Sequence, residues 1–346
     1  MRPRERVAAA LEFRAPDRVP VEYHASPAGF VEHGGKLLEL WRSNPDDFGT
    51  PDRFKIPTAG PGPRAWRDAW GVEWREEAFG AGGIPVHRPL ADWSAWPGFQ
   101  MPGLPEDSGP DFERERIRCQ QHRQTHFLKS AWISLFELMH ALRPFEDVLM
   151  DIATCSPEIE RLADALTEHH LVHIEYLLKR GVDAVQFGDD FGTQSDLMLS
   201  PAMWRRFFRP RYDVLVRRAK EAGAKVFFHS CGNVKRLLCD FAALGVDAVW
   251  PQLSLYDLRW LSRFCRDARL AIALHPDRGE LMIRSTPEKV RAYVQELAEI
   301  FEVDRGGAWF YVEVDRGFPF RNVAALTETI AEIRRAPAAA PAAARP

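Results

Sequence analysis

The sequence has few cysteines and no long apolar run, and both absences limit what the protein can be. Five cysteines in 346 residues are an odd number and too few for a disulfide framework. No stretch approaches the roughly 20 apolar residues of a membrane span. The charged start, MRPRERVAAALEF, has no apolar signal-peptide core. We therefore expect a cytoplasmic protein with reduced thiols that has no membrane partner.

An excess of basic charge is also absent. The chain has 46 Lys and Arg against 49 Asp and Glu, which gives a net charge of -3. A general nucleic-acid binder would carry a basic field, so we do not expect nucleic acid as a partner. Hydrophobic residues make up 46% and charged residues 27%, the balance of a globular protein that can bury a large core.

Short apolar runs alternate with helical patterns from about residue 130 onwards. Such continuous runs are typical of a parallel sheet covered on both faces. The predicted strands are 130–137, 183–188, 224–230, 247–250, 269–274 and 308–314, with 19–24 and 71–74 as two further candidates. Eight strands can close a barrel, so we predict an α/β fold, a single (β/α)8 TIM-like barrel. An open doubly wound sheet is the alternative, but it would normally carry a G-x-G-x-x-G turn, which is absent.

The two ends of the chain differ from this regular part. Residues 43–110 are dense in Pro, Gly and Trp, and we expect an irregular segment with a short hairpin around 68–80 that covers the barrel. The Ala- and Pro-rich residues 336–346 are expected to be a disordered tail. The predicted organisation is one barrel domain, 1–335, in a monomer or homodimer.

Polar residues follow nearly every apolar run. In a barrel, catalytic residues lie at the carboxyl ends of the strands. The residues in these positions include Glu22, His24, Glu137, Asp189, Asp190, Gln194, His229, Cys231, Asn233, Gln252, His275, Asp277, Arg278, Glu313 and Asp315. So many at equivalent positions indicate an enzyme with a small-molecule substrate.

His229 and Cys231 form the most specific element. They are one residue apart at the end of a predicted strand, and alternate residues of an extended segment point the same way. Imidazole nitrogen and thiolate sulfur together favour zinc. The alternative is a buried histidine beside an inert cysteine. The other cysteines, Cys119, Cys155, Cys239 and Cys265, are expected to be core fillers.

Carboxylates are candidates for the rest of the site. Adjacent side chains diverge, so at most one of Asp189 and Asp190 is expected to face it, while the other caps a turn. Glu313 and Asp315 share one face of an extended strand, so one of them could complete a metal shell.

Several segments, in this order, resemble the uroporphyrinogen decarboxylase superfamily, and in particular its corrinoid-linked methyltransferases of the methylcobalamin:coenzyme M type. They are RERVAAALEFRAPDRVPVEYH, DAWGVEW, SLFELMHALRPFEDVLMD, FGDDFGTQSDLMLSPAMWRRFFRPRY, KVFFHSCGNVKRLLCDFAALGVDAVWPQ and RGFPFRNVAAL. The resemblance implies a (β/α)8 barrel with its site at the carboxyl-terminal rim. The segment PVEYHASPAGF lacks the arginine-rich motif of the decarboxylases, which favours the methyltransferases.

The methyltransferase branch binds zinc through H-x-C and a distant cysteine near the closing segment. His229 and Cys231 match the first two ligands. The closing segment has no cysteine, and Glu313 is the expected substitute, with Asp315 second.

The resemblance therefore implies a zinc-dependent methyltransferase that moves a methyl group between a corrinoid and a small acceptor or donor. The corrinoid would be carried by a partner protein or be part of the substrate. Glu137, Asp190 and Gln194 are expected to orient substrate or carry protons. The residues expected to contact the cofactor are Glu22, His24, Asn233, Gln252 and His275. Two alternatives stay open: a metal-independent lyase that decarboxylates a porphyrinogen or a smaller acid, and a barrel that binds a ligand without turnover.

Overall fold

The computed structural model describes residues 1–50, 53–58, 63–80 and 82–335. The chain divides into two compact units. Unit 1 comprises Met1–Pro57, His122–Leu128 and Asp247–Pro346, and unit 2 comprises Thr58–Gln121 and Lys129–Val246. The tail predicted over 336–346 lies outside the described residues.

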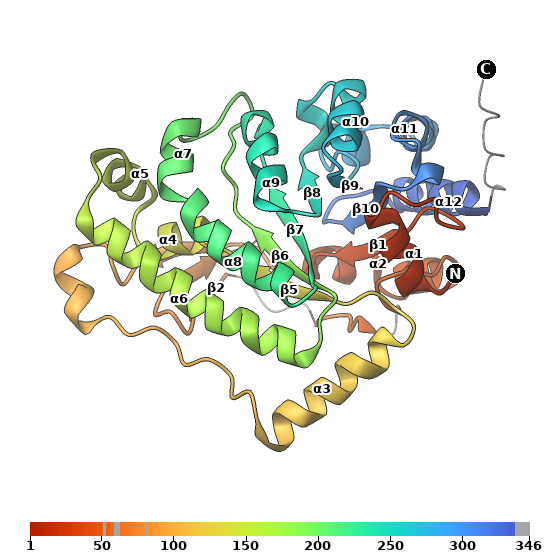
Figure 1. Cartoon of the computed structure of the whole chain (residues 1–346). Coiled ribbons are helices and arrows are strands. Elements are labelled where there is room, and N and C mark those ends of the chain that lie inside the picture. The colour runs from red at the N-terminus through yellow and green to blue at the C-terminus, as the bar shows by residue number, and fades with distance from the viewer. Residues whose placement is uncertain (51–52, 59–62, 81, 336–346) are drawn as a thin grey trace. The chain divides into compact units, whose positions relative to one another are not determined.

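The described residues contain seven parallel strands, each followed by one or more helices (Figure 1). This is the α/β, TIM-like fold that the sequence predicts. The strands are short, and most of their residues are buried, as expected for a parallel sheet with helices on its faces.

Unit 1 holds four of these strands in the spatial order β1-β10-β9-β8. Their bounds are β1 (Val21–Ala25), β8 (Ala248–Pro251), β9 (Ala271–Leu274) and β10 (Ala308–Val314). Its helices are α1 (Pro3–Leu11), α2 (Pro27–Ser43), α10 (Leu258–Asp267), α11 (Pro287–Ile300) and α12 (Phe320–Arg335), with short turns η4 (Leu253–Leu255), η5 (Glu280–Arg284) and η6 (Val303–Arg305).

Unit 2 holds the other three strands in the order β7-β6-β5. Their bounds are β5 (Lys129–Ile133), β6 (Ala184–Gly188) and β7 (Lys225–Ser230). The helical segments are η2 (Trp93–Gly98), α3 (Gly109–Arg123), α4 (Phe136–Leu142), α5 (Phe145–Thr154), α6 (Pro157–Arg180), α7 (Pro201–Phe207), α8 (Arg209–Glu221), η3 (Lys235–Leu237) and α9 (Leu238–Leu244). The last two residues of α3 belong to unit 1.

The hairpin expected around 68–80 is present within a small antiparallel sheet. Its strands are β2 (Arg64–Arg67), β3 (Glu73–Glu76) and β4 (Ile84–His87). The candidate barrel strand at 71–74 was therefore wrong, because this segment pairs antiparallel with β2 and β4. Most side chains of β3 are at least partly exposed, unlike those of the buried parallel strands.

Two predicted elements have different bounds. The helix expected over 200–223 is divided into α7 and α8 at Phe208, because Pro210 lacks the N–H that would continue the hydrogen-bond ladder. The strand expected over 130–137 ends at Ile133, and Glu137 lies in the first turn of α4. The second change places the candidate residue Glu137 on a helix and not at a strand end.

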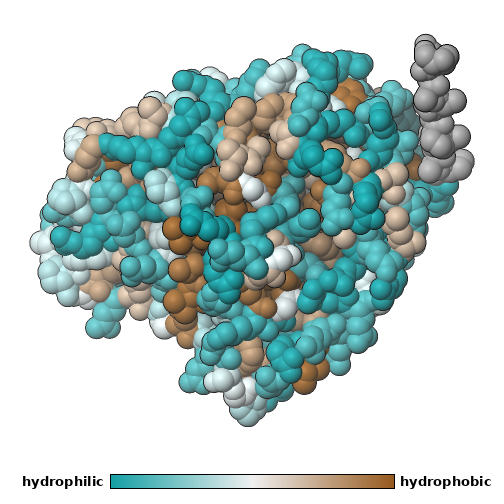
Figure 2. Space-filling view, viewed as in Figure 1, coloured by the Kyte–Doolittle hydropathy of each residue, from teal (hydrophilic) through white to brown (hydrophobic). Residues whose placement is uncertain are grey.

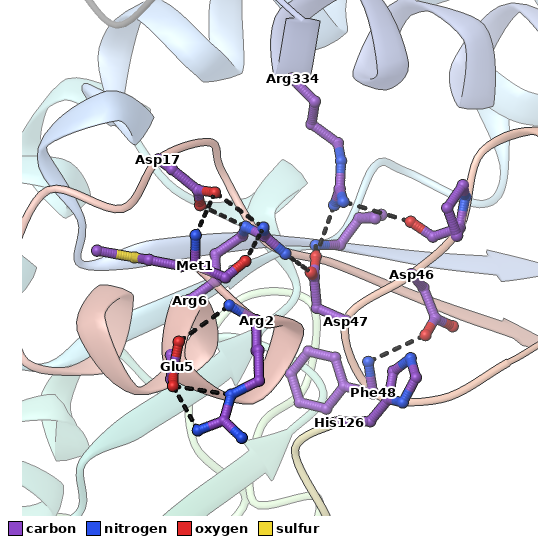
Figure 3. Close-up of polar contacts among 12 residues, drawn as sticks. Met1, Arg2, Glu5, Arg6, Asp17, Asp46, Asp47, Phe48, His126 and Arg334 are labelled. Atoms are coloured by element: carbon purple, nitrogen blue, oxygen red, sulfur yellow. Dashed lines mark hydrogen bonds and ion pairs between the residues drawn. The ribbon is translucent and has the colours of Figure 1, made fainter. Parts of the chain in front are cut away.

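A buried ion-pair network ties together the two ends of unit 1 (Figure 3). Arg6 of α1 pairs with Asp47 and with Asp17, and Arg334 of α12 pairs with Asp47 at 2.7 Å. Arg6 and Asp47 are buried, so each charge depends on the others for solvation. The first and last helices of the described chain are thereby fixed to one carboxylate.

The face of the molecule seen in Figure 2 is mostly hydrophilic, with hydrophobic residues between the hydrophilic ones. Among the residues with described coordinates, no helix combines the length and the apolar character needed to cross a bilayer.

Cys119 and Cys265 are buried as predicted, but Cys155 and Cys239 are exposed, so the expectation of core fillers was wrong for these two.

Candidate metal centre

The candidate site of unit 2 is built where β6 and β7 end side by side. The two strands are parallel, with Gly188 opposite His229. Asp189 and Asp190 follow β6 directly, and Cys231 follows β7. Parallel pairing therefore brings the two predicted motifs to one edge of the sheet.

Three side chains at this edge offer donor atoms to one point. The sulfur of Cys231 lies 3.3 Å from Nε2 of His229, and that nitrogen lies 3.5 Å from Oδ1 of Asp190. All three donor atoms lie within 4.8 Å of one another, and each residue is partly exposed. Within the described part of the chain, this is the one group of three or more His, Cys, Asp or Glu side chains placed to hold a single metal ion.

Two glycines allow the loops after β6 and β7 to cross. A Cβ on Gly232 would overlap the backbone of Gly192, and Gly232 has a φ of 77°, which disfavours other residues. The crossing is fixed by hydrogen bonds from Asn233 N to Thr193 O at 2.7 Å and from Cys231 N to Asp190 Oδ1 at 2.6 Å. The backbone of Cys231 is thus held to the carboxylate of Asp190.

Asp189 points away from the donor group and binds the backbone at the start of α4, in the connection after β5. Its carboxylate is fully buried and accepts hydrogen bonds from Leu135 N at 2.8 Å, Glu137 N at 2.7 Å and the hydroxyl of Tyr212. Helix α4 has no side-chain cap of its own, so Asp189 satisfies N–H groups at its start. Burial raises the pKa of Asp189 to about 7. The expectation that the two adjacent aspartates diverge is confirmed.

Glu137 joins the site from α4. One of its oxygens accepts a hydrogen bond from Asp190 N at 3.3 Å, and the other lies 3.1 Å from Nε2 of His140. Burial raises the pKa of Glu137, but the hydrogen bond and positive charge of His140 outweigh it and leave this pKa below its usual value. Glu137 is therefore ionised beside Asp190 at neutral pH.

An aromatic ring borders the donor group. Trp132 of β5 stands edge-on to the ring of His229, with 5.2 Å between ring centres. The same indole occupies the space that a side chain at position 188 would need, so Gly188 permits the contact. Trp132 thereby restricts the orientation of His229.

Gln194 and Asn233 lie on the two crossing loops. Gln194 is exposed. Asn233 donates a hydrogen bond to Ser195 O at 3.1 Å and accepts one from Lys235 N at 3.2 Å, so its amide shapes the loop. Their predicted roles toward substrate and cofactor stay predictions.

The other predicted residues lie in unit 1, at the ends of its strands. His24 of β1 is opposite Glu313 of β10, and Glu22 is opposite Tyr311. Glu313 accepts a hydrogen bond from Arg278 at 3.1 Å and lies 3.8 Å from Nε2 of His275, which is held by Trp250 through a 2.9 Å hydrogen bond to Nδ1. Burial raises the pKa of Glu313.

These contacts engage Glu313 in a group with Arg278, His275 and Asp315, all within unit 1. The prediction that Glu313 is a metal ligand therefore stays a prediction, as do the predicted cofactor contacts of Glu22, His24, Gln252 and His275.

Sequence reasoning missed several residues that position the site. Trp132, His140 and Tyr212 are single polar or aromatic residues within apolar or helical patterns and carry no motif. The two glycines had a signal in the sequence, because Gly192 and Gly232 each lie within four residues of the end of a predicted strand. Their pairing across 40 residues of sequence is visible only in the structure.

The donor set fits zinc. Zinc accepts imidazole nitrogen, thiolate sulfur and carboxylate oxygen, and a catalytic zinc site commonly has three protein ligands and one open position. Asp190, His229 and Cys231 offer one donor of each kind and are partly open to solvent.

The fold and this site define an α/β barrel-type protein with its polar groups at the carboxyl ends of the strands. The chain belongs to the uroporphyrinogen decarboxylase (URO-D) family, whose model matches residues 125–332. No curated protein matches the sequence.

Solved structures support the fold. A structure described as a methyltransferase from Methanosarcina mazei has a TM-score of 0.67 and 15% identity, covering 96% of this chain and 99% of that one. A dihydropteroate synthase from Xanthomonas albilineans has a TM-score of 0.33 and 14% identity, covering 46% and 57% of the two chains. The first similarity supports the same fold over the whole chain, and the second is too low to support any inference.

Proposed function

We propose that the chain is a zinc-dependent methyltransferase that moves a methyl group between a corrinoid and a small acceptor or donor. The observation that carries the proposal is the grouping of Asp190, His229 and Cys231 at the ends of β6 and β7. Membership of the URO-D family and the fold shared with a methyltransferase support this class of reaction. The corrinoid would be carried by a partner protein or belong to the substrate.

Asp190, His229 and Cys231 would hold the zinc. Asp190 would supply the carboxylate that was expected from Glu313, since its oxygen lies 3.5 Å from the His229 nitrogen. When bound, zinc would lower the pKa of a coordinated thiol and so supply a nucleophile near neutral pH. This favours a small thiol as the methyl acceptor.

The chain's own residues would orient and deprotonate that acceptor. Glu137 is ionised and neighbours Asp190, so its carboxylate can take the thiol proton. Asp189 fixes the start of α4, from which Glu137 projects. Trp132 holds the His229 ring in one orientation and shields one edge of it.

The same groups argue against the lyase. A decarboxylase that grips carboxylate substrates needs a basic pocket, whereas the donor group contains the carboxylate of Asp190 and has that of Glu137 beside it. Two carboxylates here would repel an anionic substrate. This observation supports methyl transfer over decarboxylation.

The proposal is tested by following methylcobalamin demethylation by its absorbance, with zinc-loaded protein and a panel of small thiols. We expect turnover with at least one thiol and a loss of about 100-fold or more in Cys231→Ala, because a ligand is removed. Cys239→Ala is the matched control, since Cys239 is an exposed cysteine of the same unit. The proposal fails if the zinc-loaded parent transfers no methyl group to or from any partner tested, or if both variants are equally active. Metal-independent decarboxylation of a porphyrinogen would instead establish the lyase.

A further inference from the structure

A small cavity in unit 1 combines a buried hydroxyl with several arginines. It has a volume of about 170 Å³ and is lined by Arg18, Tyr23, Asn44, Arg334 and Arg335 among others. It lies where the loop after α2 meets the last turn of α12, and none of these residues has a part in the proposed methyl transfer. The site is therefore separate from the candidate metal centre in its residues and in its chemistry.

The hydroxyl of Tyr23 is the unexplained group. Tyr23 is only 2% exposed, and its ring stacks on Trp41 with 5.1 Å between ring centres. Its hydroxyl oxygen is buried and has no hydrogen-bond partner among the residues that the structure describes. A buried hydroxyl without a partner is unfavourable, so a group that fills the cavity and accepts this proton would stabilise the fold.

Two hydrogen-bond acceptors at the edge of the cavity are already engaged, because Arg334 donates to Pro45 O at 3.3 Å and to Asp47 at 2.7 Å. The side chain of Asn44 donates to Leu40 O at 2.9 Å. The Tyr23 hydroxyl keeps a donor that no described residue accepts. A ligand that brings acceptor atoms would therefore suit the cavity.

Positive charge exceeds negative charge here. Asp47 is shared by Arg6 and Arg334, whereas Arg18 and Arg335 form no ion pair with any described residue. Burial lowers the pKa of Arg18, and the positive charges of Arg334 and Arg6 lower it further, while Asp47 and Asp17 offset only part of this. A bound anion would relieve this repulsion.

We propose that this cavity is a binding site for a small oxyanion of the phosphate type. Arginine forks match the oxygens of such an anion, and the Tyr23 hydroxyl adds a third donor. Its volume suits a group of a few heavy atoms and is below the roughly 300 Å³ of pockets for larger ligands. The anion would bridge the ends of α2 and α12.

The test is calorimetric titration of the full chain with inorganic phosphate, at constant ionic strength set with potassium chloride. We expect saturable binding to the parent, about tenfold weaker binding in Arg18→Gln and in Arg335→Gln, and a smaller loss in Tyr23→Phe. Arg321→Gln is the matched control, because Arg321 is an exposed arginine of α12 outside the cavity. It should bind phosphate as the parent does. Acetate, with one charge, should bind more weakly than phosphate.

The variant Tyr23→Phe shows whether the Tyr23 hydroxyl binds the anion or only supports the fold. Without phosphate the variant should be at least as stable as the parent, because the hydroxyl has no protein partner to lose. With phosphate its gain in melting temperature should be smaller than the parent's. The proposal is overturned if the parent shows no saturable binding, or if Tyr23→Phe and the arginine variants bind phosphate as well as the parent.

Discussion

The sulfur of Cys231 lies 3.3 Å from the Nε2 atom of His229. The two residues are alternate positions at the end of β7, so extended backbone alone points both side chains the same way. Asp190 reaches the same point from β6 and also accepts the backbone N–H of Cys231. The donor group therefore depends on how closely the loops after β6 and β7 approach each other.

The close contact between these two loops predicts a strong effect of Gly232→Ala. The new Cβ would overlap the backbone of Gly192 at a φ of 77°, so the variant should lose about 2 kcal/mol or more of unfolding free energy and bind zinc more weakly. Urea denaturation and zinc titration measure the two effects. Gly245→Ala is the control, since Gly245 has a φ of 87° but open space around it. Equal losses in the two variants would contradict the role given to the crossing.

Replacement of Glu137 by glutamine should slow methyl transfer without removing the metal. The amide cannot take a proton, so we expect a fall in kcat of about 100-fold or more. Zinc content should be unchanged, because Glu137 is outside the donor group. Glu146→Gln, an exposed acid of α5, should behave as the parent does. A parent-like rate in Glu137→Gln would show that the proton leaves by another route.

His170 should make unit 2 less stable in acid. Burial lowers the pKa of His170 to about 4 from an unfolded value of 6.5. Between these two pH values the unfolded chain binds a proton that the folded chain does not. The contribution of His170 to the free energy of unfolding is therefore fully present above about pH 6.5 and is lost as the pH falls toward 4. The loss should be about 3 kcal/mol.

The measurement for His170 is the unfolding free energy of the parent and of His170→Gln at pH 7 and pH 4.5. The variant should be less sensitive to acid than the parent, because glutamine does not titrate. His173→Gln on the same helix should reduce the acid sensitivity by less, because burial also lowers the pKa of His173 but its side chain is only partly buried. Equal acid sensitivity in the parent and His170→Gln would exclude His170 as the source.

The buried network of unit 1 predicts a large effect of Asp47→Asn. Asp47 is fully buried and pairs with Arg6 and Arg334, so the change leaves the Arg334 guanidinium without its carboxylate and Arg6 with Asp17 alone (Figure 3). We expect a loss of about 3–5 kcal/mol in unfolding free energy. Arg305→Gln, which breaks an exposed pair with Glu302, should change stability little. A small effect of Asp47→Asn would show that the network is replaceable.

The sequence predicted the parallel strands and their polar ends because burial imposes continuous apolar runs that end where the chain meets solvent. It also predicted that Asp189 and Asp190 diverge. It did not predict that Asp189 caps α4, since this contact joins residues more than 50 positions apart. The strand at 71–74 was misassigned because a short apolar stretch does not reveal its pairing partner. Asp190 was predicted as a catalytic residue, and only the geometry places its carboxylate beside His229.

Zinc content, measured by mass spectrometry on protein loaded with zinc and then desalted, tests the central claim most directly. The proposed donor group predicts about one zinc per chain in the parent and in Cys239→Ala, and little in Cys231→Ala and Asp190→Ala. A parent without zinc, or equal zinc in the parent and Cys231→Ala, would contradict it.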